Sequence, residues 1–101
     1  MTQLRLVYPR RYERRLEEIY EHIAAENPAA AIRTIMRIRE AVERLALFPS
    51  IGRSGRVDGT RELVIVSTPY IVPYRVKNDA VQIITILHSA QRWPSTFSGI
   101  V

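Results

Sequence analysis

The spacing of apolar residues changes past the middle of the chain, and this change constrains the fold more than any other feature. Between Arg10 and Phe48, apolar residues recur at steps of three and four, which is typical of helices that bury one face. After Thr60 come short stretches rich in valine, isoleucine, threonine and tyrosine, which favour strands. The sequence therefore predicts helices followed by a sheet.

Prolines divide the helical part of the chain in two. Pro9 suits the first turn of a helix that begins near Arg10, and Asn27-Pro28 marks a break at which Asn27 caps a second helix. The second apolar pattern runs to Phe48, where Pro49 stops it. We expect the core to contain Leu16, Ile19, Ile35, Val42 and Leu45 from the helices and Ile84 from the sheet.

Extended structure is expected in residues 3–8, 61–67, 70–76 and 81–88, with turns at 68–69 and 77–80. A parallel pair needs a crossover of about a dozen residues, so these short turns require an antiparallel meander. We expect an α+β fold of order β-α-α-β-β-β, with a two-helix hairpin packed on one face of a mainly antiparallel four-stranded sheet. The length of 101 residues predicts a single domain, residues 1–101.

Charge and composition narrow the choice of partner. The formal net charge is +5, and 14 of the 15 basic residues are arginine, with Lys77 the only lysine. Arginine stays protonated and presents a planar fork of donors suited to phosphate or carboxylate, so nucleic acid or an acidic protein is the expected partner. The lack of cysteine excludes disulfides and thiol catalysis. With no long apolar run, a cytoplasmic protein is expected, with no signal peptide or membrane span.

The loop from Pro49 to Thr60 holds three glycines and two arginines, Arg53 and Arg56. Such a loop is expected to be exposed and conformationally permissive, so that its arginines are available to a partner.

Five motifs follow one another between residues 4 and 94. They are Asn27-Pro28-Ala29-Ala30-Ala31, Phe48-Pro49-Ser50-Ile51-Gly52-Arg53, Arg61-Glu62-Leu63, Tyr74-Arg75-Val76 and Leu87-His88-Ser89-Ala90-Gln91-Arg92-Trp93-Pro94. In this order they resemble the RelE/ParE toxin superfamily, whose element order is the one expected here. The resemblance implies a type II toxin held in a heteromeric complex by a cognate ParD-like antitoxin, whose acidic or amphipathic segment would wrap the hairpin and the sheet.

The resemblance also implies one of two activities. The RelE-like branch cuts mRNA on the ribosome, and the ParE-like branch is associated with poisoning of DNA gyrase. RNA cleavage needs groups that accept and return a proton, besides cations for the phosphate. RelE-like enzymes typically place lysines in the loop that here holds only Arg53 and Arg56. A conceivable nuclease set remains: Glu62 or His88 as the base, with Arg61 and Arg75 on the phosphate.

Structural roles compete with each of these functions. Arg61 and Glu62 are expected more often as a structural pair, and His88 as a capping residue. Trp93 is expected to close the core more often than to stack on a base. His22 is expected to be a surface residue, with no metal or catalytic site around it. Tyr70 and Tyr74 are expected in the core.

The lysine-free loop and the closing Leu87-His88-x-x-x-Arg92-Trp93-Pro94 favour the ParE-like branch. We therefore expect a toxin without catalytic residues, metal or cofactor, which arrests growth by poisoning DNA gyrase. Ribosome-dependent mRNA cleavage is the alternative, and a DNA-binding or regulatory module is a third hypothesis. The expected contacts with the target or the antitoxin are Arg53, Arg56, Arg61, Arg75 and Arg92.

Overall fold

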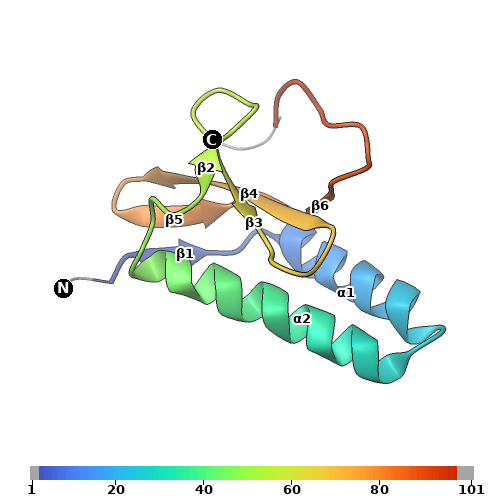
Figure 1. Cartoon of the computed structure of the whole chain (residues 1–101). Coiled ribbons are helices and arrows are strands. Elements are labelled where there is room, and N and C mark those ends of the chain that lie inside the picture. The colour runs from blue at the N-terminus through green and yellow to red at the C-terminus, as the bar shows by residue number, and fades with distance from the viewer. Residues whose placement is uncertain (1–2, 98–101) are drawn as a thin grey trace.

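The computed structural model describes residues 3–97, which form two helices and a sheet (Figure 1). The elements in chain order are β1 (Arg5–Val7), α1 (Arg10–Ala24), α2 (Pro28–Glu43), the 3-10 helix η1 (Arg44–Ala46), β2 (Arg53–Ser54), β3 (Arg61–Val64), β4 (Tyr70–Lys77), β5 (Ala80–Ile83) and β6 (Leu87–His88). The antiparallel pair α1 and α2 lies under one face of the sheet, as expected.

The strands are arranged in the order β1-β5-β4-β3-β2, and β6 pairs with the start of β4. Only β1 is parallel to its neighbour, β5, and all other pairs are antiparallel. The α+β class, the hairpin and the mainly antiparallel sheet are thus confirmed.

The prediction of four strands was wrong, because the described residues form six. One extra strand is β2, which lies within the loop before β3 and forms because Arg53 pairs with Glu62 of β3. The other arises because the last expected strand is interrupted. Tyr74 lies opposite Ile83 and Ile71 opposite Leu87, so one strand has one residue more between these pairs. This extra residue is a bulge that separates β5 from β6.

The helices begin where their capping signals predict. The Asn27 side chain accepts a hydrogen bond from the Ala30 N–H at 3.0 Å, and Pro28 occupies the first turn of α2. The α-helix ends at Glu43 instead of continuing to Phe48, because its last turn tightens into η1.

The core lies between the helices and the sheet. Leu16, Ile19, Val42, Leu45 and Ile84 are buried as expected, whereas Ile35 is only half-buried and packs against the core from its edge. Tyr70 and Tyr74 are buried in the same core, which confirms their structural interpretation.

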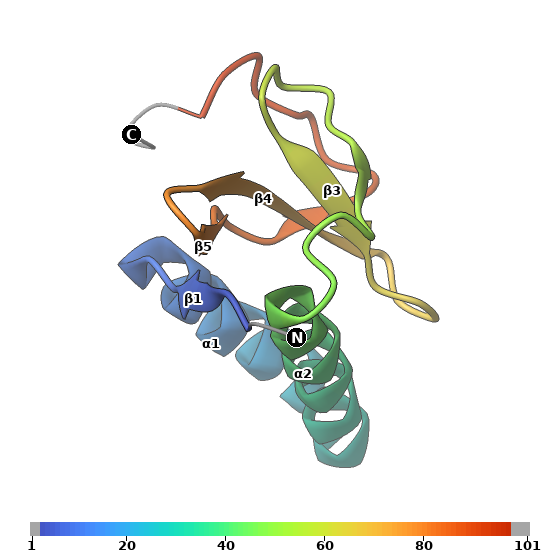
Figure 2. The same ribbon diagram turned by 90° about the vertical axis from the view of Figure 1, so that its left-hand side faces the viewer.

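Alternation along the strands gives the sheet two distinct faces. Val72 and Tyr74 of β4 point into the core beside the helices. Their neighbour Arg75 points to the opposite face, together with Gln82 of β5 and Glu62 of β3. We call this helix-free side the outer face. The segment after β6 passes over it and meets the loop that precedes β3 (Figures 1 and 2). Within residues 3–97, neither helix is long and apolar enough to cross a membrane.

Candidate functional site

A buried carboxylate organises the arginines of the loop. Glu62 is only 2% exposed, and its Oε1 accepts from Nε of Arg53 at 3.0 Å while Nη2 of Arg53 lies at 3.0 Å as well. Its Oε2 accepts from the backbone N–H of Arg56 at 2.7 Å. Charge-assisted bonds of this kind are among the stronger ones in proteins. The loop arginines are exposed as expected, each side chain by about half, and Glu62 orients both of them.

The start of the loop is fixed from below by a buried tyrosine. The Tyr74 hydroxyl donates to the Pro49 carbonyl at 2.7 Å and accepts from the Gly52 N–H at 2.9 Å. A Cβ at Gly52 would lie 2.6 Å from the Tyr74 ring, so only glycine allows this approach. Burial raises the pKa of Tyr74 above its ordinary value, against the opposing effects of the Gly52 hydrogen bond and the Arg61 charge.

Trp93 joins the C-terminal segment to the loop. The guanidinium of Arg56 lies 3.8 Å from the centre of the Trp93 ring, which is a cation–π contact. Trp93 is half-buried and is not part of the core, so the expected closure of the core was wrong. Its Nε1 is buried and has no hydrogen-bond acceptor among the described residues. Arg92 beside it is exposed.

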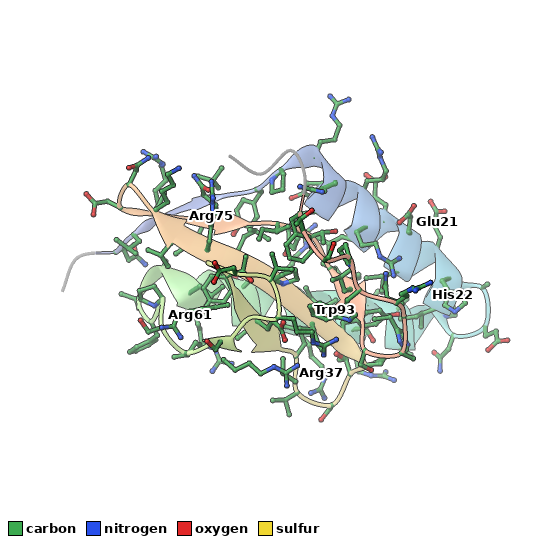
Figure 3. All side chains as sticks on the ribbon, turned by 90° about the horizontal axis from the view of Figure 1, so that it is seen from above. Glu21, His22, Arg37, Arg61, Arg75 and Trp93 are labelled. Carbon is green, nitrogen blue, oxygen red and sulfur yellow. The ribbon has the colours of Figure 1, made fainter. Side chains whose placement is uncertain are left out.

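Arg75 lies on the outer face, on β4 (Figure 3). Its Nε donates to Oε1 of Gln82 at 2.7 Å, which fixes the plane of the guanidinium. Its Nη2 is buried without an acceptor in the described part of the chain. The guanidinium lines a cavity of about 300 Å³ together with residues 57–60 and 95–97.

The conceivable nuclease set is not brought together on one face. Glu62 and Arg75 lie on the outer face, whereas Arg61 shares the face of Tyr74 and donates through Nη1 to the Gly52 carbonyl at 2.8 Å. His88 pairs with Tyr70 in the register and shares its side of the sheet, with the two rings in an edge-on contact. Nδ1 of His88 accepts from the Ala90 N–H at 3.0 Å, which is the expected capping role.

His88 instead lines one cavity with His22 at the junction of helix and sheet. Both line a cavity of about 500 Å³ with Arg15 and Glu18 of α1 and Tyr70 of β4. The His22 side chain is exposed, as expected. Among residues 3–97, no three histidine, cysteine or acidic side chains are grouped so that they could hold a metal ion.

A groove runs between α2 and β3, which we call the edge groove. Its cavity is about 500 Å³, and β3 forms one wall with residues that include Val64 and Val66, both exposed. On its outer edge β3 pairs with β2 only through Arg61 and Glu62, so the backbone beyond Glu62 has no neighbouring strand on that side among the described residues. The remaining lining residues are Arg37, Glu40, Ala41, Glu43, Arg44, Leu63 and Ile65.

Sequence reasoning found the arginines but missed the edge groove. The exposed apolar residues of α2, Ile32 and Met36, are 51% and 53% exposed but are not among the residues that line the groove, so they gave no signal for it. The contact between Arg56 and Trp93 had no signal either, since it joins residues from distant parts of the chain.

Comparisons with known proteins agree with one another. A family model described as "ParE toxin of type II toxin-antitoxin system, parDE" matches residues 6–93. Y4kP of Sinorhizobium fredii (strain NBRC 101917 / NGR234), named as a candidate toxin, is 46% identical over 94 residues, which are 93% of this chain and 97% of that protein. Toxin RelE2 of Caulobacter vibrioides is 37% identical over 76 residues, covering 75% and 84% of the two chains.

Solved structures show the same relationship. A chain of the chromosomal ParDE toxin–antitoxin system from P. aeruginosa is similar with a TM-score of 0.79 and 29% identity, over 85% of this chain and 96% of that one. A chain of the RelBE2 toxin–antitoxin complex from Mycobacterium tuberculosis shares the fold with a TM-score of 0.63 and 18% identity, over 90% and 97% of the two chains. The family model covers most of the sequence, and this chain belongs to the ParE toxin family of type II toxin–antitoxin systems.

Proposed function

We propose that this toxin arrests growth by poisoning DNA gyrase through the arginines of its outer face, without making or breaking a covalent bond itself. The guanidinium groups of Arg53, Arg56 and Arg75 are pre-oriented for an acidic partner, because Glu62 pairs with the first two and Gln82 with the third. Arg92 extends the same basic surface on the C-terminal segment. Arg61, on the other face, is assigned to holding the loop.

The observation that carries this proposal is the state of Glu62. A general base needs a free oxygen that can reach the proton it removes. Both oxygens of Glu62 accept hydrogen bonds from the loop, and the carboxylate is sealed from solvent. The histidine that could replace it, His88, lies on the opposite side of the sheet from Arg75. The outer face thus offers cations for a phosphate, and neither Glu62 nor His88 is available beside them to take a proton.

We also infer that a cognate antitoxin occupies the edge groove. The groove offers an open strand edge on β3 and exposed apolar side chains, which are the two features that a bound segment needs. The resemblance to the ParDE chain supports a partner of this kind. An antitoxin bound only in the edge groove would leave most of the outer face uncovered. Neutralisation therefore requires further contacts between antitoxin and outer face, or a change in the shape of the toxin.

The test of the activity uses purified toxin with gyrase and, separately, with translating ribosomes. We expect inhibition of supercoiling or trapping of cleaved DNA, with ribosome-bound mRNA left intact. Arg75→Gln should weaken this inhibition by about tenfold, because a charge-assisted contact is worth about 1.5–3 kcal/mol and part of it survives in glutamine. Arg10→Gln, on exposed α1, is the matched control and should inhibit like the wild type.

Ribosome-dependent mRNA cleavage is the second candidate, favoured by the identity with Toxin RelE2 and by the joint cavity of His22, His88 and Tyr70. If the protein cuts mRNA at defined positions and His88→Ala abolishes cutting while gyrase is unaffected, this second candidate replaces the first.

A further inference from the structure

Two buried side-chain donors lack acceptors within residues 3–97, and both lie where the C-terminal segment covers the outer face. They are Nη2 of Arg75 and Nε1 of Trp93 (Figure 3). A buried donor without an acceptor is unfavourable, and proteins usually avoid it. With this segment packed on the sheet, both donors therefore stay without a hydrogen bond. The donor of Arg75 lies next to a cavity.

The cavity beside Arg75 offers three different kinds of contact. The guanidinium of Arg75 supplies donors, and within residues 3–97 it is bonded to Gln82 through Nε alone. The carboxylate of Asp58, exposed at the rim, supplies an acceptor and is not part of an ion pair among the described residues. The ring of Phe97, half-buried, supplies an aromatic surface.

These contacts select a ligand that combines an oxyanion, N–H donors and a flat ring. An acidic peptide provides the oxyanion, but its carboxylate would face Asp58 and leave Phe97 unused. A nucleotide provides all three, with phosphate for arginine, base N–H groups for a carboxylate, and a ring that stacks on an aromatic side chain. The volume of about 300 Å³ is at the lower end of the range for small-molecule pockets and suits one nucleotide.

We propose that this cavity binds one nucleotide of a single-stranded nucleic acid, with its phosphate on Arg75, its base stacked on Phe97 and the base N–H groups on Asp58. Nη2 is buried and residues 95–97 line the same cavity, so these residues shift outward to let a phosphate oxygen reach it. The proposal rests on the proposed function, since it assigns Arg75 to the DNA of a gyrase–DNA complex. Its test uses nucleic acid without gyrase, so the nucleotide proposal and the proposed function can each fail while the other stands.

The experiment titrates the full chain with a short single-stranded deoxyadenylate oligomer and follows the fluorescence of Trp93, the only tryptophan. Trp93 stands two residues before the moving segment and contacts Arg56, so binding should change its emission. Arg75→Gln should weaken the affinity by about tenfold or more. Lys77→Gln is the matched control, because it removes the same charge from the same strand, and it should change the affinity by less than about twofold.

A second pair of measurements separates base from phosphate. Phe97→Ala should weaken oligomer binding by about five- to a hundredfold, which is the range for loss of one stacked base, and should leave the weak affinity for inorganic phosphate unchanged. If Arg75→Gln does not fold, Arg75→Lys keeps the charge and removes the fork, and it should still bind less tightly. Equal losses in the Arg75 and Lys77 variants, or tighter binding of a polyaspartate peptide than of the oligomer, would overturn the proposal.

Discussion

At the scale of single residues, the loop depends on Glu62. Tyr74 and Arg61 hold the start of the loop, and its middle is held by the hydrogen bonds that Arg53 and Arg56 give to this one carboxylate. A buried charge is tolerated only when it is fully paired, and Glu62 meets that condition. The two arginines lose little hydration because their side chains stay about half exposed. Glu62 thus both positions the arginines of the basic surface and stabilises the loop.

The variant Glu62→Gln tests this dependence. Glutamine keeps the shape but loses the charge, so we expect the free energy of unfolding to fall by about 1–3 kcal/mol, the range for a lost charged hydrogen bond. Urea unfolding followed by circular dichroism measures it. Glu17→Gln, on the exposed face of α1, should change the stability by less than about 0.5 kcal/mol. If both variants unfold at the same urea concentration as the wild type, Glu62 does not hold the loop.

At the scale of elements, the edge groove is a surface that β3 and α2 form together. Val64 of β3 lines this groove and is 45% exposed, and Val76 of β4 is equally exposed but is not among the residues that line it. Val64→Lys should weaken binding of the cognate antitoxin by about tenfold or more, because a charge replaces apolar contact area. Val76→Lys should bind like the wild type. Calorimetry with the purified pair measures both, and equal affinities would place the antitoxin elsewhere.

The elements differ in how well the sequence predicts them. Local signals set both helices, since Asn27 and Pro28 fix a boundary and the apolar stripe fixes the buried face. The strand β2 has no such signal, because two residues of a glycine-containing loop become a strand only when Glu62 pairs with Arg53. The bulge between β5 and β6 has no local sequence signal either, since it depends on how the chain pairs with β4.

At the scale of the whole molecule, the sheet separates chemical groups that the sequence places side by side. Arg61 and Glu62 are adjacent, yet alternation sends them to opposite faces, one to the loop carbonyls and one to the loop arginines. The sequence could identify these residues as functional candidates. It could not show that Glu62 was already paired, or that His22 and His88 line one cavity, because both facts depend on packing between distant elements.

The same packing predicts how the whole molecule responds to alkali. Burial raises the pKa of Tyr12, assisted by Tyr8, and burial also raises the pKa of Tyr74. In the unfolded chain these hydroxyls ionise near the ordinary tyrosine value of about 10, while in the folded protein they stay protonated to higher pH. The folded state therefore binds more protons, and the stability that is fully present below pH of about 10 is lost as the pH rises further.

Each such tyrosine should lower the free energy of unfolding by up to about 1.4 kcal/mol per pH unit in that window. Urea unfolding at a series of pH values from neutral to strongly alkaline measures the slope. Tyr12→Phe has no hydroxyl to ionise, so its stability should fall less steeply than that of the wild type. Tyr20→Phe, at a residue that is 40% exposed on the same helix, is the matched control and should keep the wild-type slope. A slope that Tyr12→Phe leaves unchanged would mean that the buried tyrosines do not cause the alkaline loss of stability.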